Sequence, residues 1–390
     1  MAIEGRSDDK AGGRIRLGMV GGGEGAFIGA VHRIASRIDD HYEFVAGALS
    51  STPEKSRRSG AALGLAADRI YDDYESMAKA ESKRHDGIEA VAIVTPNDVH
   101  AGPTYAFLKA GIHVICDKPL TVSLAEAKKM RAAVEKAGLI FALTHNYTGY
   151  PLVRRMREMV RAGELGEIRL VQAEYPQDWL TGAPEGAGNK QAEWRVDPKR
   201  SGAGGALGDI GTHTYNLADY VTGLELSELS ADLASFGAGR KLDDNAQIML
   251  RYANGARGAI WASQVAPGNE NGLMLRVYGT KGGLQWRQDS PNHVFWSPFE
   301  KSTRIITRGG PESGEAAARV TRVPPGHPEG YLEGFASIYS EVALAIKAAR
   351  TGRKPAKAVH FPTIDDGVKG LAFVEAAVKS SKANGKWVKP

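Results

Sequence analysis

The sequence has only one cysteine, Cys116, among its 390 residues. A chain with a single thiol cannot form an internal disulfide, and it suits a reducing compartment. Long apolar runs are missing as well, because no stretch approaches the ~18 consecutive apolar residues of a membrane-spanning helix. The first residues, MAIEGRSDDKAGGR, include no apolar segment of the kind found at the centre of a secretory signal. These absences predict a cytoplasmic protein.

A strong excess of charge of one sign is also missing. The 50 Lys and Arg and the 45 Asp and Glu residues leave a formal net charge of +5, and the basic residues are scattered. We therefore expect no nucleic-acid or membrane partner. The ten histidines do not show the spacing of metal ligands, so we expect no metal. What remains is the composition of an ordinary globular protein, 42% apolar and 24% charged, long enough for two domains.

The first part of the chain alternates short apolar strands with helical segments. Five strands are predicted, at residues 15–20, 42–50, 89–96, 112–119 and 139–146. Helical spacing of apolar residues lies between them, with helix starts at Pro103 and Ser123 and helix stops at Gly111 and Gly138. Strands and helices that alternate in this way predict an α/β fold with a doubly wound parallel sheet.

After about residue 150 the pattern changes. Turns such as ANGA and GTKGG join successive strands between residue 225 and about residue 305. Helices are expected at 151–166, near 207–222, at 329–350 and at 363–384, and a strand at 167–179. This part of the chain is therefore predicted to be an α+β domain with a large, mostly antiparallel open sheet.

The stretch VGGGEGAFIGAVH, residues 20–32, follows the first strand and opens the first helix. In that setting, backbone N–H groups and the helix dipole hold a pyrophosphate. The pattern Gly-x-Gly-x-x-Gly/Ala fits strictly as Gly21, Gly23 and Ala26, or with a three-residue insertion as Gly21, Gly23 and Gly29. A flexible loop is the plain alternative. The position favours a dinucleotide site, whose expected contacts are Gly21, Gly23, Gly25, Ala26, Phe27 and Ile28.

The end of the second strand indicates which dinucleotide is bound. NAD enzymes usually have Asp or Glu there to bind the ribose hydroxyls, whereas the 2′-phosphate of NADP needs donors and positive charge. This chain has Ser50, Ser51 and Lys55, followed by Arg57 and Arg58. A helix start with a solvated basic first turn would look the same. The residues favour NADP over NAD.

Polar residues follow the next buried strands, at the edge where such sheets bind their ligands. The first group lies in VTPNDVH, residues 94–100, which could also be only a capped turn. The second lies in CDKP, residues 116–119, where a lysine before a proline at the end of a buried strand differs from an ordinary solvated lysine. The expected cofactor contacts here are Thr95, Asn97, His100, Asp117, Lys118 and Asn146.

The second half contains GALGDIGTH, with Asp209 and His213 four residues apart. On a helix the two side chains share one face, so the carboxylate can orient the imidazole. Oxidation of an alcohol by hydride transfer requires removal of the hydroxyl proton, and histidine is suited to that role. A structural pair on a helix face is the alternative interpretation.

Candidate substrate residues combine aromatic rings with polar groups. In EYPQDW, the period of two places Tyr175, Gln177 and Trp179 on one face of a strand. Trp194 and Arg195 precede the helix of His213. Such groups suit the apolar faces and hydroxyl rim of a sugar ring, although core or interface aromatics would give the same pattern. Further candidates are Tyr147, His327 and Tyr331, of which the last two either add to the pocket or cap a helix.

Several motifs together resemble the glucose–fructose oxidoreductase / inositol dehydrogenase (Gfo/Idh/MocA) family. They are the glycine loop ending in GAVH, TPNDVH, AGIHVICDKPL, HNYTGYPLVRRMREMVRAGELGEI, SGAGGALGDIGTH and DGVKGLAFVEAAVKSSKANGKWV, and they span residues 15–388. The resemblance implies that Lys118, Asp209 and His213 are catalytic, and it makes Gly29 the third glycine of the loop. The sequence departs from the family at Asp117, where Glu is usual, and in the loop insertion.

The resemblance also implies two domains and an activity. A dinucleotide-binding Rossmann domain is expected at residues 14–147, and a substrate-binding and oligomerisation domain at 148–390, whose last helix packs back toward the first domain. His213 would take the hydroxyl proton, Asp209 would hold the imidazole, and Lys118 would bond the reacting oxygen. YPQDW and WR are similar to the pyranoside dehydrogenases of the family.

The expected protein is therefore an NAD(P)-dependent sugar or polyol dehydrogenase. A pyranose or anhydrosugar is the first choice of substrate, and inositol is the second. A homo-oligomer, dimer or tetramer, is the expected assembly. The alternative function is a non-catalytic NAD(P)-binding regulator on the same fold, which would not need the Lys, Asp and His residues.

Overall fold

The computed structural model describes residues 13–182, 184–187 and 190–390, and these form two compact units. The first unit consists of the chain as far as Thr121 together with Ala125–Gly149 and Tyr331–Val368. The second consists of Val122–Leu124, Tyr150–Gly330 and Lys369–Pro390. The predicted division into residues 14–147 and 148–390 as separate domains stays a prediction.

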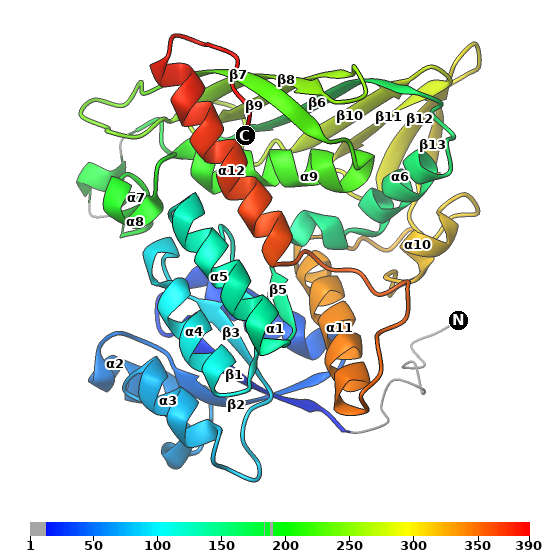
Figure 1. Cartoon of the computed structure of the whole chain (residues 1–390). Helices are drawn as coiled ribbons and strands as arrows, with labels where there is room; N and C mark the ends of the chain where they lie inside the picture. Colours follow the sequence, from blue (N-terminus) through cyan, green and yellow to red (C-terminus); the bar gives the residue numbers. More distant parts are fainter. Residues whose placement is uncertain (1–12, 183, 188–189) are drawn as a thin grey trace. The chain divides into compact units, whose positions relative to one another are not determined.

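The first unit is built on a parallel sheet of five strands in the order β2-β1-β3-β4-β5 (Figure 1). The strands are β1 (Ile15–Gly21), β2 (Tyr42–Ala48), β3 (Ala90–Val94), β4 (His113–Cys116) and β5 (Phe141–Leu143). Every residue of β3, AVAIV, is buried, as expected for a central strand that is covered on both faces. The predicted parallel α/β sheet is confirmed.

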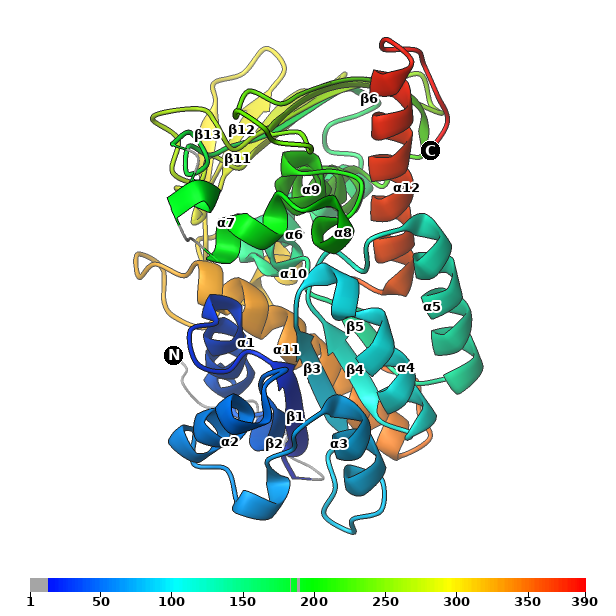
Figure 2. The same ribbon diagram turned by 90° about the vertical axis from the view of Figure 1, so that its left-hand side faces the viewer.

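Helices cover both faces of this sheet (Figure 2). They are α1 (Phe27–Ile38), α2 (Pro53–Ala62), α3 (Tyr74–Glu81), α4 (Ala101–Lys109), α5 (Leu124–Ala137) and α11 (Tyr331–Arg350). Apolar side chains of α1 and α11 join those of β1 in one core that includes Val31, Ile338 and Leu17. Helix α4 begins at Ala101, so Pro103 lies in its first turn. Proline is tolerated there because the N–H groups of the first turn have no hydrogen-bond partner within the helix.

The second unit is built on a sheet of eight strands in the order β13-β12-β11-β10-β6-β9-β8-β7. All neighbouring strands are antiparallel except β6 and β9. The strands are β6 (Ile168–Pro176), β7 (Leu226–Ala234), β8 (Asn245–Tyr252), β9 (Arg257–Ser263), β10 (Met274–Gly279), β11 (Gly282–Arg287), β12 (His293–Pro298) and β13 (Arg304–Thr307). The predicted open, mostly antiparallel sheet is confirmed.

Helices α6 (Pro151–Arg161) and α9 (Thr212–Thr222) pack on one face of this sheet (Figure 1). The remaining helices of the unit are α7 (Lys190–Arg195), α8 (Pro198–Ser201), α10 (Gly314–Ala318) and most of α12 (Ile364–Lys382). The strands alternate buried and exposed residues, and the outward side chains include apolar ones. These are Leu170, Met249, Tyr278, Phe295 and Ile305.

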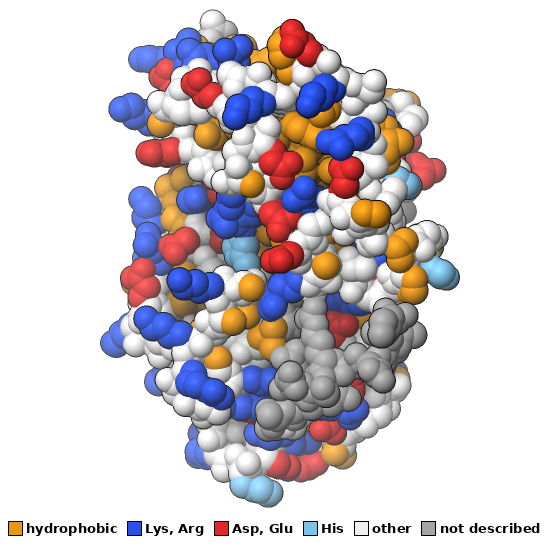
Figure 3. Space-filling view, turned by 90° about the vertical axis from the view of Figure 1, so that its right-hand side faces the viewer, with side chains coloured by type: hydrophobic (Ala, Val, Ile, Leu, Met, Phe, Trp, Pro, Cys, Tyr) orange, Lys and Arg blue, Asp and Glu red, His pale blue; other side chains and the backbone are white. Residues whose placement is uncertain are grey.

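The last helix, α12, is divided between the two units. Ile364–Val368 belong to the first unit and Lys369–Lys382 to the second. Among the residues that the structure describes, no helix is long and apolar enough to span a membrane. Acidic and basic side chains are interspersed over the face drawn in Figure 3.

Candidate active site

The glycine loop of the first unit is shaped by a close crossing of two glycines. Gly22 has a positive φ of 73°, and a Cβ on it would lie 2.9 Å from the Cα of Gly29 in α1. A Cβ on Gly29 would in turn lie closer than 3.0 Å to the Cα and carbonyl of Gly22. Helix α1 can therefore approach the loop this closely only without a side chain at residue 29. This contact gives Gly29 the packing role of the third glycine.

The rest of the loop is held by backbone contacts and then opens outward. Gly23 N–H donates to the carbonyl of Leu49 at the end of β2, at 3.1 Å. A Cβ on Gly25 would meet no atom of the described residues within 4 Å. Phe27, the first residue of α1, is 68% exposed, whereas Ile28 packs on the core. The lip formed by residues 24–27 therefore points away from the core.

The basic residues after β2 are mostly paired with carboxylates. Arg57 contacts Asp72 at 2.5 Å, and Arg58 contacts Glu24 at 2.6 Å. Lys55 makes no ion pair with another described residue. The Ser50 hydroxyl accepts the N–H of Thr52 at 3.1 Å, and the Ser51 side chain is exposed.

The end of β3 offers one unused polar atom. The hydroxyl oxygen of Thr95 is buried and finds no hydrogen-bond partner among the described residues. Asn97, two residues further along the chain, is buried as well. His100 is used by the protein itself, because its two ring nitrogens face the carbonyls of Thr95 and Pro119, each at 2.9 Å. We therefore expect Thr95, rather than His100, to bond a ligand.

Asp117 and Lys118 follow β4. One oxygen of Asp117 accepts the Lys118 N–H at 2.8 Å and the Thr144 hydroxyl at 2.9 Å, so the shorter carboxylate fixes the backbone before Lys118. Burial, together with the nearby charge of Lys118, lowers the pKa of His145 to about 3. Asn146 and Tyr147, which come next in a short 3₁₀ turn, are buried in the same unit as Lys118.

These features fit a dinucleotide. The crossing of Gly22 and Gly29 leaves the loop backbone open to a pyrophosphate. The N-cap residue of α1, Ala26, provides no side-chain cap, so the first N–H groups of the helix can donate to phosphate oxygens. The buried Thr95 hydroxyl supplies a further group at the carboxyl end of β3. The first unit thus carries a candidate nucleotide site.

In the second unit, Asp209 lies on a π-helical turn, Leu207–Gly211, that leads directly into α9. The sequence predicts a regular helix here. Asp243, in the loop before β8, explains the start of the turn, because its carboxylate accepts the N–H groups of Gly205 at 2.8 Å and Leu207 at 2.7 Å. Turns of this kind are frequent at functional sites.

A polar cluster surrounds Asp209. Its Oδ2 accepts hydrogen bonds from Arg195 Nε at 3.1 Å and from Gln264 Nε2 at 2.9 Å. Gln264 also lies 3.4 Å from Gln177 Oε1, which accepts the Trp179 indole N–H at 3.1 Å. The cluster therefore links the π-helical turn to the end of β6.

The cluster continues from Gln177 toward the ring of His213. Asn271 Oδ1 accepts the Gln177 amide at 2.8 Å and the Tyr175 hydroxyl at 2.6 Å. The ring of Tyr175 lies 6.2 Å from that of His213, which is buried. Tyr175, Gln177 and Trp179 thus belong to one connected group through these hydrogen bonds. The predicted shared strand face does not account for it, because β6 ends at Pro176 and Gln177 and Trp179 lie beyond the strand. A carboxylate, an imidazole, amides and aromatic rings together can bind and deprotonate a hydroxyl compound.

The other predicted substrate residues lie in different surroundings. The guanidinium of Arg195 lies 5.8 Å from the centre of the Trp179 ring, and the side chain of Trp194 is outside the described part of the structure. His327 is exposed, and its carbonyl accepts a hydrogen bond from Arg308. Tyr331 is the first residue of α11 and packs against Phe335 in the first unit.

Sequence reasoning did not single out Gln264 and Asn271. Gln264 is 1% exposed and directly follows β9, and Asn271 lies before β10. A polar residue directly after a predicted strand was the available signal for Gln264. The hydrogen bonds of Asn271 span 94 and 96 residues, and no local pattern shows such contacts.

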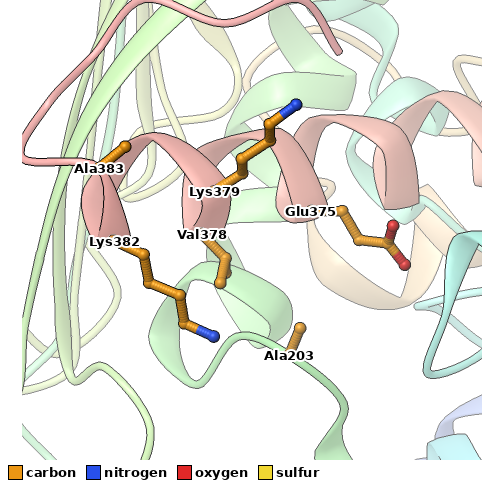
Figure 4. Close-up of a pocket in the computed structure, with 6 residues that line it drawn as sticks. All are labelled: Ala203, Glu375, Val378, Lys379, Lys382 and Ala383. Carbon is orange, nitrogen blue, oxygen red and sulfur yellow. The ribbon is translucent and has the colours of Figure 1, made fainter.

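A separate hollow of about 400 Å³ lies along α12, away from these residues (Figure 4). Lys382 and Val378 extend toward Ala203 across it, and Lys379 points away. It contains no candidate site residue. Over the described parts of the chain, no group of three or more His, Cys, Asp or Glu side chains is placed to hold a metal ion.

A parallel sheet with a glycine loop, together with an open-sheet unit that carries a partly buried Asp209 and a buried His213, defines a class of dinucleotide-dependent oxidoreductase. Two family models match the chain, one described as an oxidoreductase family with an NAD-binding Rossmann fold over residues 15–145 and the other as the GFO/IDH/MocA C-terminal domain over residues 153–285. The chain therefore belongs to the Gfo/Idh/MocA oxidoreductase family.

Solved structures and a curated relative agree with this family. An oxidoreductase from Sinorhizobium meliloti is 57% identical with a TM-score of 0.88, covering 96% of this chain and 99% of that one. An inositol dehydrogenase homologue from Azotobacter vinelandii, complexed with NADH and myo-inositol, is 34% identical with a TM-score of 0.90, covering 97% and 98%. Levoglucosan dehydrogenase of Pseudarthrobacter phenanthrenivorans is 26% identical over 416 residues, 96% of this chain and 97% of that protein.

Proposed function

We propose that the protein oxidises a secondary alcohol on a sugar ring, with a nicotinamide dinucleotide as hydride acceptor. The observation that carries this proposal is the connected group of Asp209, Gln264, Gln177, Asn271 and Tyr175. It combines hydrogen-bonding groups for neighbouring hydroxyls with an aromatic ring that could lie against a sugar face. The nearby imidazole of His213 provides a base.

Each catalytic residue has a distinct role in the proposal. A bound nicotinamide would supply the acceptor for the hydride of the carbinol carbon. His213 accepts the hydroxyl proton, and Lys118 donates a hydrogen bond to the oxygen as it becomes alkoxide-like. Asp209, held by Arg195 and Gln264, bonds a neighbouring hydroxyl and stabilises the imidazolium.

A pyranose or anhydrosugar is the proposed substrate, and an inositol is the alternative. Trp179 and Tyr175 beside the amides of Gln177 and Asn271 favour a ring with apolar faces and a rim of hydroxyls. Similarity to levoglucosan dehydrogenase supports the first choice, whereas the greater identity to the inositol dehydrogenase homologue supports the second.

NAD is the cofactor that we propose. The sequence favours NADP because of Lys55, Arg57 and Arg58, but carboxylates neutralise both arginines. Similarity to proteins solved with NAD⁺ and NADH supports NAD as well.

We also propose that the protein is a homo-oligomer and works in the cytoplasm. The outward face of the eight-stranded sheet exposes Met249, Phe295 and Ile305 at 55%, 37% and 56%, and a second copy of the same face is the proposed occupant. The cytoplasmic location is proposed because the single cysteine, Cys116, is buried with a free thiol, which suits a reducing compartment.

The activity is tested with a panel of pyranoses, anhydrosugars and inositols, each supplied with NAD or NADP. The absorbance of the reduced nicotinamide reports turnover. The proposal expects turnover of a ring alcohol, with a pyranose or anhydrosugar preferred. Tight cofactor binding without turnover of any compound would instead favour the regulator.

A further inference from the structure

The glycine loop carries a carboxylate, that of Glu24, in the lengthened segment between Gly23 and Gly29. Glu24 accepts hydrogen bonds from Nε and Nη2 of Arg58 on the same oxygen, Oε2, at 2.8 and 2.6 Å. The hydrogen bonds and charge of Arg58 lower the pKa of Glu24, so its carboxylate is ionised at neutral pH. The loop thus carries a negative charge opposite helix α2.

The backbone that leads into this carboxylate is fixed to the elements around β2. Glu24 N–H donates to the Ser59 hydroxyl at 3.0 Å, and the preceding Gly23 N–H donates to the Leu49 carbonyl at 3.1 Å. In a fold of this kind, the adenosine ribose is bound near the end of the second strand and the pyrophosphate at the glycine loop. Glu24 therefore lies in the part of the unit that is expected to contact the hydroxyl or phosphate at the 2′ position of the ribose.

A 2′-phosphate would meet unfavourable charges here. It carries about −1.5 to −2 charges near neutral pH and needs an unpaired guanidinium or ammonium. Arg58 is held by Glu24, and Arg57 contacts both Asp72 and Glu54, at 2.5 and 3.5 Å. Lys55 makes no ion pair with a described residue, but its charge also acts on the Glu24 carboxylate and helps to lower the pKa of that group. The 2′-hydroxyl of NAD is neutral, so it does not need those cations and is not repelled by the carboxylate.

We propose that Glu24 is a cofactor-specificity residue, which keeps Arg58 from the 2′-phosphate of NADP(H) and repels that phosphate, so that the enzyme prefers NAD(H). The inference rests on the proposed use of a nicotinamide dinucleotide. Both side chains of the pair are exposed, at 59% for Glu24 and 65% for Arg58, so removal of the carboxylate's charge leaves Arg58 able to reach a ligand phosphate.

The test measures binding of NADH and NADPH to the full chain by their intrinsic fluorescence, which needs no substrate. Wild type is expected to bind NADH more tightly than NADPH. Glu24→Gln, which keeps the shape and the backbone bond to Ser59, is expected to tighten NADPH about tenfold and to change NADH less than about twofold. The gain should shrink as salt rises and disappear when Arg58→Gln is added.

Glu54→Gln is the matched control, because it removes the same charge from α2 but leaves the Glu24–Arg58 pair intact. It should change the NADPH-to-NADH ratio less than about twofold. An unchanged ratio in Glu24→Gln would overturn the inference, and so would equal weakening of both cofactors, which would mean that Glu24 only holds the loop. If wild type bound neither cofactor, the proposed function itself would fail.

Discussion

A buried histidine in helix α1 makes folding stability depend on pH. His32 of α1 is fully buried; its Nδ1 contacts the Tyr339 hydroxyl at 2.8 Å, and its Nε2 has no hydrogen-bond partner within the described chain. Burial lowers the pKa of His32 from 6.5 to about 4, although the Asp117 carboxylate opposes this. Between pH 6.5 and about 4, His32 is therefore mostly protonated in the unfolded chain and mostly neutral in the folded chain.

The size of the effect follows from this difference in pKa. One pKa unit corresponds to about 1.4 kcal/mol, so neutral His32 contributes about 3 kcal/mol of stability that is fully present above pH 6.5 and lost as the pH falls toward 4. By pH 5 about 2 kcal/mol of this contribution should already be gone.

The assay measures the free energy of unfolding of the cofactor-free chain in urea at several pH values between about 7.5 and 4.5. His32→Asn should be less stable than wild type at pH 7.5, and the difference should shrink by about 2 kcal/mol near pH 5. Tyr339→Phe is the control, because it breaks the same hydrogen bond but keeps the histidine. A His32→Asn curve that stayed parallel to wild type over the whole range would refute the reasoning.

Three further substitutions test other parts of the account. Gly29→Ala should weaken NADH binding at least about tenfold, because the new Cβ overlaps Gly22. Gly208→Ala is the control and should leave binding unchanged, because no described atom lies within 4 Å of its Cβ. Equal affinities of the two variants in a fluorescence titration would contradict the role given to the glycine loop. Gln264→Leu should lower kcat/KM about tenfold or more without affecting NADH binding, because Asp209 loses the hydrogen bond that the Gln264 amide donates. Unchanged kinetics would show that Gln264 does not contribute to the active site. Phe295→Glu should reduce the mass measured by light scattering, and an unchanged mass would exclude that sheet face as the interface.

Much of the fold could be predicted because its signals are local. Strand β3 lies inside the predicted range 89–96, since a buried central strand is apolar throughout. The predicted fifth strand at 139–146 is only Phe141–Leu143, because a 3₁₀ turn takes over at Asn146. The π-helical turn at Leu207–Gly211 depends on Asp243, more than 30 residues away, and helical periodicity does not show it.

The candidate site was less accessible to sequence reasoning, because its partners are distant in the chain. The strand period predicts Tyr175, Gln177 and Trp179 on one strand face, but β6 ends at Pro176, so Gln177 and Trp179 lie beyond the strand. Only the fold shows that Asn271 and Gln264 connect these side chains. Arg58 is a further example of a distant partner. The sequence favours it as a ligand of a cofactor phosphate, whereas in the structure it is paired with Glu24, 34 residues earlier.

The most direct test of the central claim compares cofactor binding with turnover in Lys118→Ala and His213→Ala. With the best ring alcohol from the substrate panel, the account predicts that both variants still bind NADH but produce reduced cofactor at least about a hundredfold more slowly than wild type. Turnover at the wild-type rate in either variant would contradict the proposed chemistry.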